Sequence, residues 1–129
     1  MYIVDSSVWV ALFLDNDTQH VKAVAVMEKI GASPISIPYG VVLETATVLS
    51  RKQSKALANR FVEYVRDNPQ ISVQMSFMSE DMRVFLEEND RLSFVDALIK
   101  NMAVHTGFVL VSFDKRLLRS ARRASPRAA

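Results

Sequence analysis

Residues 2–8 read Tyr-Ile-Val-Asp-Ser-Ser-Val, an apolar run that ends in a carboxylate followed by two hydroxyls. The run 2–4 has the composition of a short buried strand. Ser6 or Ser7 can cap a helix that continues through Phe13. The segment therefore predicts a strand that passes directly into a helix, with an acid, Asp5, at the junction.

The same alternation continues along the whole chain. Further strands are expected at 34–38, 71–75 and 108–112. Helices are expected at about 19–30 with Thr18 as cap, and at about 39–49, 54–67, 79–88, 93–106 and 114–123. Because the strands are short and apolar rather than amphipathic, they predict an α/β protein with a central parallel sheet covered on both faces, a three-layer α/β/α fold.

The helix expected at 79–88 is acidic and amphipathic. Its pattern predicts that Met82, Phe85 and Leu86 point inward.

Length and composition predict one domain, residues 1–123, and a flexible tail, residues 124–129. The chain has no cysteine, which excludes disulfides and thiolate metal sites, and its two histidines argue against zinc. Because there is no signal-peptide pattern and no apolar run near 20 residues, we expect a soluble cytoplasmic protein without a membrane partner.

Basic residues are concentrated at the C-terminal end. The chain has 16 basic and 14 acidic side chains, and no acid follows Asp114. This pattern suits a polyanionic partner, although a solvated terminal helix has the same composition. The candidate contact residues in the last helix are Lys115, Arg116, Arg119, Arg122 and Arg123.

Four carboxylates occupy positions that are hard to explain structurally. Asp5 and Asp114 follow predicted strands, whereas Glu44 and Asp96 lie inside predominantly apolar helices. Ligands of parallel α/β folds bind beyond the carboxyl ends of the strands, where such residues would meet. Four gathered charges require a counter-ion, and a hard divalent cation acting on phosphate is the natural one.

Each acid also has a structural explanation. Asp5 and Asp114 could cap the helices that follow them. Asp96 follows Ser93 at the spacing of a capping box. Glu44 shares a helical face with apolar neighbours, but a half-buried face would let it reach solvent. The joint placement of the four favours a functional site.

Four segments, residues 2–8, 38–44, 92–98 and 109–115, together resemble PIN-domain ribonucleases of the VapC toxin type. The resemblance spans nearly the whole chain. It implies a PIN-like fold and catalytic carboxylates at Asp5, Glu44, Asp96 and Asp114, with Asp5, Asp96 and Asp114 nearest to Mg²⁺ or Mn²⁺. The supporting hydroxyls would be those of Ser6, Ser93 and Ser112.

The same resemblance implies a metal-dependent endoribonuclease that cuts single-stranded or structured RNA. It also implies a toxin that forms homodimers and is inhibited by a small cognate antitoxin. Other classes stay open at this stage. One is a non-catalytic PIN-like RNA-binding or scaffold domain, and another is a phosphoaspartate phosphohydrolase or receiver. A phosphohydrolase requires a second Asp where Ser7 stands.

Overall fold

The computed structural model describes residues 1–124, and it contains one four-stranded sheet. The strands are β1 (Tyr2–Val4), β2 (Ile35–Pro38), β3 (Ile71–Gln74) and β4 (Val109–Val111). All neighbouring strands are parallel, in the order β3-β2-β1-β4, and Ile3 of β1 pairs with Ser36 on one side and Leu110 on the other. The predicted parallel sheet is confirmed.

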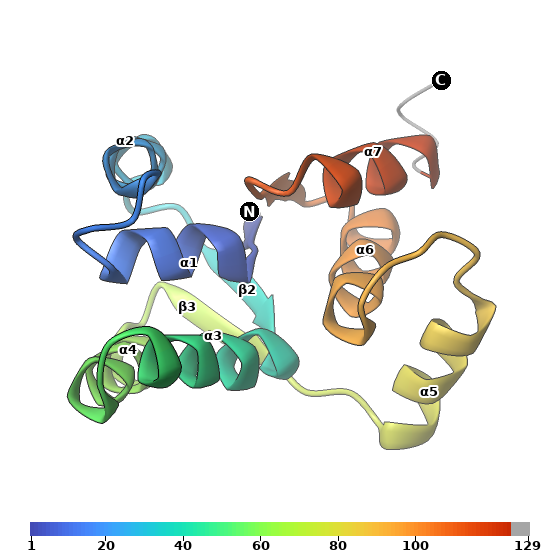
Figure 1. Ribbon diagram of the computed structural model, residues 1–129. Helices are drawn as coiled ribbons and strands as arrows, with labels where there is room; N and C mark the ends of the chain where they lie inside the picture. Colours follow the sequence, from blue (N-terminus) through green and yellow to red (C-terminus); the bar gives the residue numbers. More distant parts are fainter. Residues whose placement is uncertain (125–129) are drawn as a thin grey trace.

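Helices connect the strands and cover the sheet on both faces. They are α1 (Ser6–Phe13), α2 (His20–Ile30), α3 (Tyr39–Lys52), α4 (Lys55–Asp67), α5 (Met78–Glu87), α6 (Phe94–Thr106) and α7 (Lys115–Ala124). Figure 1 shows α1–α4 on one side of the strands and α5–α7 on the other. This is the expected three-layer α/β/α architecture, with β1 and β2 in its centre.

Local sequence signals explain several helix ends. The Ser54 hydroxyl accepts from the Leu57 N–H, as an N-cap does, and Gly107 ends α6 with a positive φ of 72°. The prediction that Thr18 caps α2 is wrong. That helix starts at His20, and the turn before it is held by Asp17, whose carboxylate accepts from the Gln19 N–H at 2.8 Å.

The core lies on both sides of the sheet. Ile3 and Ile37 from the central strands are fully buried. On the α1–α4 side, Trp9 packs against Phe61, with 5.9 Å between the ring centroids, and its indole N–H donates to the Val4 carbonyl at 3.0 Å. This bond ties α1 to β1 and so fixes where the loop holding Asp5 lies.

Helix α5 differs from the sequence prediction. Leu86 is 82% exposed, Met82 45% and Phe85 38%, whereas Val84 is buried. The physical reason is that α5 packs against α6 outside the sheet layers, so only one narrow side of it is covered. Met82 and Leu86 of the expected inward face therefore point outward, whereas Phe85 stacks on Phe94 of α6, with 4.7 Å between the ring centroids.

The part of the chain that the structure describes contains no helix long and apolar enough to span a membrane. Ala124 is the last residue of α7. The predicted flexible tail otherwise falls on residues 125–129, which lie outside the described residues.

Candidate active site

The ends of β1 and β4 bring Asp5 and the β4–α7 loop together. The Asp5 N–H donates to the Val111 carbonyl at 2.9 Å and extends the pairing of the two strands. The Asp5 side chain is 2% exposed, and one of its oxygens, Oδ2, accepts from Ser7 at 2.8 Å and from Ser112 at 2.7 Å. Hydroxyl donors thus compensate part of the charge of this buried carboxylate.

Ser7 is a member of the site that the sequence analysis did not assign. Besides donating to Asp5, its hydroxyl accepts from the Phe113 N–H at 3.0 Å. Ser6, which was predicted to support the site, lies 3.4 Å from Asp5 Oδ1, a long hydrogen bond. The two adjacent serines were equivalent as possible helix caps. The shorter bond to Asp5 and the contact with Phe113 distinguish Ser7 from Ser6.

Asp114 caps the helix that follows it, which was one of the two interpretations of this residue. Its Oδ1 accepts from the N–H groups of Arg116 at 2.9 Å and Leu117 at 3.2 Å, which is the geometry of an N-terminal cap of α7. Its own N–H donates to the Ser112 hydroxyl at 2.9 Å. Ser112 therefore connects Asp5 and Asp114 through one oxygen.

Asp96 lies in the first turn of α6. The Ser93 hydroxyl accepts from the Asp96 N–H at 3.1 Å, so Ser93 caps the helix as predicted. The cap uses the Asp96 backbone and leaves its carboxylate available to the site.

Glu44 lies on the inward side of α3, and its Oε2 is buried without a hydrogen-bond partner within the described residues. Burial, followed by repulsion from Asp5, raises the pKa of this carboxyl above its ordinary value. A buried carboxylate oxygen without a hydrogen bond destabilises the folded state, and a cation or a bound water would offset that loss.

The four carboxylates face one cleft of about 300 Å³. Its other lining residues are Ser6, Ser7, Val10, Asp17, Gln19 and Lys52. Burial raises the pKa of Asp96 to about 6, and repulsion from Asp5, Glu44 and Asp114 adds to the shift. The structure thus brings together the four acids that the sequence singled out.

Within residues 1–124, no group of three or more acidic or histidine side chains is close enough to hold a metal ion as it stands. The donor set nevertheless fits a hard divalent cation, because it consists of oxygen ligands. The orphan Glu44 oxygen and the raised pKa of Asp96 mark uncompensated negative charge at the same place.

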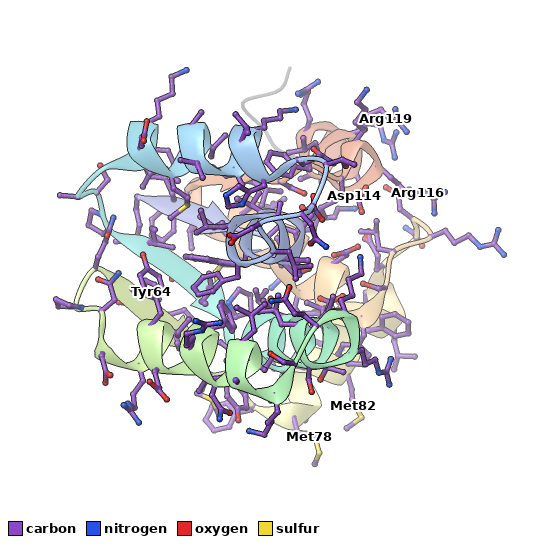
Figure 2. The ribbon with its side chains drawn as sticks, turned by 60° about the vertical axis from the view of Figure 1, so that its left-hand side comes forward. Tyr64, Met78, Met82, Asp114, Arg116 and Arg119 are labelled. Atoms are coloured by element: carbon purple, nitrogen blue, oxygen red, sulfur yellow. The ribbon has the colours of Figure 1, made fainter. Side chains whose placement is uncertain are left out.

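The basic residues of α7 are exposed, but none of them lines this cleft. Figure 2 shows Arg116 and Arg119 at the same end of the molecule as Asp114. Arg123 instead pairs with Asp90, at 2.8 Å between Nη2 and Oδ2. The five predicted contact residues therefore do not form one uniform surface, since at least one has an intramolecular partner.

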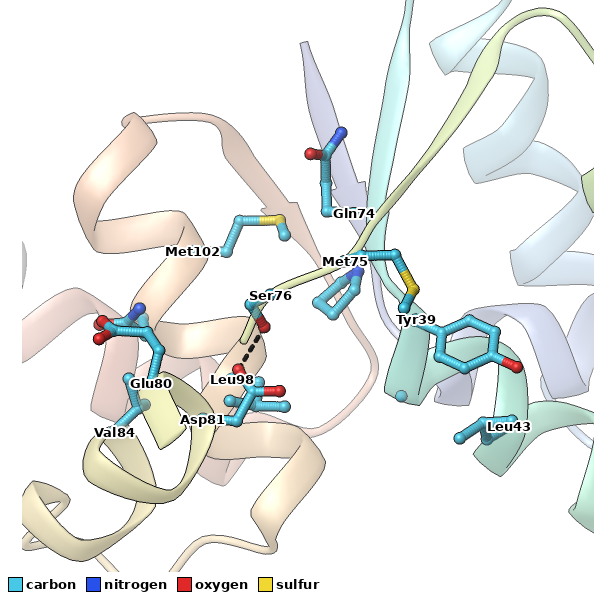
Figure 3. Close-up of a pocket in the computed structure, with 13 residues that line it drawn as sticks. Tyr39, Leu43, Gln74, Met75, Ser76, Glu80, Asp81, Val84, Leu98 and Met102 are labelled. Atoms are coloured by element: carbon cyan, nitrogen blue, oxygen red, sulfur yellow. Dashed lines mark hydrogen bonds between the residues drawn. The ribbon is translucent and has the colours of Figure 1, made fainter. Parts of the chain in front are cut away.

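A second hollow, of about 360 Å³, lies away from the acidic cleft (Figure 3). It is lined mostly by apolar side chains, including Tyr39, Leu43, Met75 and Met102. Asp81 at its edge accepts from the Ser76 hydroxyl. Its two carboxylates, Glu80 and Asp81, already have partners in Arg83 and Ser76, so this hollow does not offer the chemistry of the first cleft.

The fold and the site define a class: a parallel α/β protein with four carboxylates at the carboxyl ends of adjacent strands and on the helices beside them. Within that class the chain belongs to the PIN domain family, whose model matches residues 2–123. The predicted family and fold are thereby confirmed.

Two solved structures are similar to this chain. The crystal structure of VapC20 from Mycobacterium tuberculosis, a toxin that cleaves the sarcin–ricin loop, gives a TM-score of 0.82 at 20% identity, covering 93% of this chain and 95% of that one. The crystal structure of PAE2754 from Pyrobaculum aerophilum gives a TM-score of 0.60 at 27% identity, covering 92% of this chain and 83% of that one. No curated protein sequence matches the chain.

Proposed function

We propose that this protein is a metal-dependent endoribonuclease and the toxin of a toxin–antitoxin pair. The observation that carries the proposal is the convergence of Asp5, Glu44, Asp96 and Asp114 on one cleft at the carboxyl ends of β1 and β4. Membership of the PIN domain family supports the proposal. The structural similarity to VapC20, a toxin that cleaves the sarcin–ricin loop, supports it as well.

Asp5, Asp96 and Asp114 are the residues that would hold Mg²⁺ or Mn²⁺, directly or through water. When bound, such a cation supplies charge stabilisation at the phosphate and lowers the pKa of a water molecule. Because Mg²⁺ keeps several waters, a few carboxylates suffice. The raised pKa of Asp96 means that it must lose its proton to become a ligand.

The protein's own residues prepare the site for hydrolysis. Ser7 and Ser112 hold the Asp5 carboxylate in one orientation. Glu44, whose pKa is raised by burial, is suited to orient the attacking water or to accept its proton. Attack of that water on phosphorus would break the bond to the 3′ oxygen and leave a 5′-phosphate and a 3′-hydroxyl.

The proposed partners are an RNA substrate, a small cognate antitoxin and a second copy of this chain, in the cytoplasm. For the second copy we propose the exposed side of α5 as the contact. Arg83 pairs with both Glu80 and Glu87, which offsets part of the negative charge of this acidic helix. The exposed apolar side chains of Met82 and Leu86 can then meet those of a second copy across a two-fold axis.

The test is cleavage of a defined RNA panel with and without Mg²⁺ or Mn²⁺, including a sarcin–ricin loop oligonucleotide because VapC20 cleaves that RNA. Asp96→Asn serves as the inactive control. Metal-dependent products with a 5′-phosphate that are absent with the variant would support the proposal. Cleavage that persists in Asp96→Asn would contradict it.

A further inference from the structure

Lys52 lines the acidic cleft, although nothing in its local sequence connects it with the four acids. It is the last residue of α3, which continues three residues beyond the predicted end at Leu49. Glu44, Val48 and Lys52 follow one another at four-residue intervals, so they lie along one side of the helix. The extra turn of α3 therefore places a cation at the rim of the cleft, about 12 Å along the helix from Glu44.

Lys52 has no ion-pair partner within residues 1–124, because no carboxylate of that part of the chain lies within ion-pair distance, and its side chain is exposed. Within that same part of the chain, the other residues that line the cleft are acidic or neutral. Among the described residues that line the cleft, Lys52 thus supplies the positive charge at a site that otherwise repels polyanions.

We propose that Lys52 binds a phosphate of the RNA strand next to the one that is cut. This inference rests on the proposed function and extends it to the path of the substrate. Lysine suits the role because its ammonium group is a flexible point charge that can follow a mobile backbone phosphate. The strand would then cross the cleft from the end of α3 toward α7, where Arg116 lies beside Asp114 (Figure 2).

A purely structural role for Lys52 must be considered as well. Cations are favourable at the C-terminal end of a helix, and α3 has two in its last turn, Arg51 and Lys52. Arg51 carries the same charge at nearly the same position along the helix, but it does not line the cleft. It therefore provides a matched control for both helix stabilisation and net charge.

The experiment compares Lys52→Gln with Arg51→Gln in the full chain. RNA binding is measured in EDTA, where metal-dependent cleavage is blocked, by titrating a labelled single-stranded RNA at several salt concentrations. Loss of one phosphate contact should reduce the slope of log K against log salt by about 0.7 for Lys52→Gln and leave it unchanged for Arg51→Gln. With Mg²⁺, KM should rise roughly three- to tenfold while kcat is kept.

The outcomes separate this inference from the proposed nuclease activity. Equal effects of both variants would show that Lys52 contributes only to net charge, and would overturn its assignment as a phosphate contact. An unchanged salt slope of RNA binding in Lys52→Gln would also overturn it. So would a wild-type protein that binds no RNA. Recovery of the slope in Lys52→Arg would support it. If the wild type binds RNA with a Lys52-dependent slope but cuts none, the nuclease proposal fails and the phosphate contact stands.

Discussion

Ser112, at the end of β4, donates its hydroxyl to Asp5, at the end of β1, with 2.7 Å between the two oxygens. The two residues are 107 positions apart in the sequence, and the pairing of β1 with β4 makes them neighbours. The bond fixes the most buried of the four carboxylates in place. It also links the site directly to the sheet that supports it.

Replacing Asp5 by Asn should abolish metal-dependent cleavage. The variant keeps the size of the side chain and removes its charge, so we expect a rate loss of at least about 100-fold. The fold should be kept, because the amide oxygen can still accept from the two serines. Initial cleavage rates and circular dichroism check both points, and full activity in the presence of metal would falsify the role of Asp5.

The metal-free protein should become less stable as the pH rises from 3.8 through about 6, the ordinary and folded pKa values of Asp96. In this window the folded state holds a proton that the unfolded state has lost, so the free energy of unfolding decreases with pH. Glu44, whose pKa is raised in the same direction, adds to the trend. Thermal unfolding at several pH values in EDTA measures it.

Two controls accompany the pH experiment. Asp96→Asn should flatten the dependence, because the variant lacks the titrating carboxyl. Saturating Mg²⁺ should also weaken it, since a cation favours the ionised acids. A stability that increases across the same window in the metal-free wild type would contradict the assignment.

Replacing Ser7 by Ala should destabilise the protein by about 1–2 kcal/mol, because it leaves the part-buried Phe113 N–H and the buried Asp5 Oδ2 each without one partner. Ser6→Ala is the matched control. Its hydroxyl contacts Asp5 only at 3.4 Å, so we expect a change below about 0.5 kcal/mol. Urea unfolding measures both values, and equal losses would show that the two serines are equivalent.

Polar substitution on α5 should separate the proposed homodimer. In Met82→Ser combined with Leu86→Ser, two exposed apolar side chains one helical turn apart are lost, and the mass in solution should fall to the 14.5 kDa of the monomer. Val21→Ser on α2, also exposed, is the control and should stay dimeric. Light scattering after size-exclusion chromatography gives the masses. A double variant that stays dimeric would place the contact elsewhere.

Neutralising Arg119 and Arg122 on α7 should weaken RNA binding and reduce its salt slope by about 1.4. Point substitutions are required here, because α7 also buries Leu117 and Ala121 and its removal would open the core. The control is Arg123→Gln, whose side chain pairs with Asp90 and is expected to contribute less to binding. An unchanged slope in the double variant would exclude contact between these two arginines and RNA.

Most of the fold could be predicted because its signals are local. Apolar runs, Ser54 before α4 and Gly107 after α6 each act within one or two helical turns. The prediction for α5 failed because an amphipathic pattern shows that a helix has an apolar side but not what covers it. The C-terminal end of α3 illustrates the same limit, since the helix continues past the predicted end at Leu49 to Lys52 and packs against α4.

The sequence by itself determined the order of strands and helices and the four carboxylates, since both follow from residue type and spacing. Only the tertiary structure decided that Ser7 rather than Ser6 fixes Asp5, that one oxygen of Glu44 is buried without a partner, and that Lys52 reaches the cleft. The reason is physical. Hydrogen bonds and burial at the site depend on groups about a hundred residues apart, which become neighbours only when β4 pairs with β1.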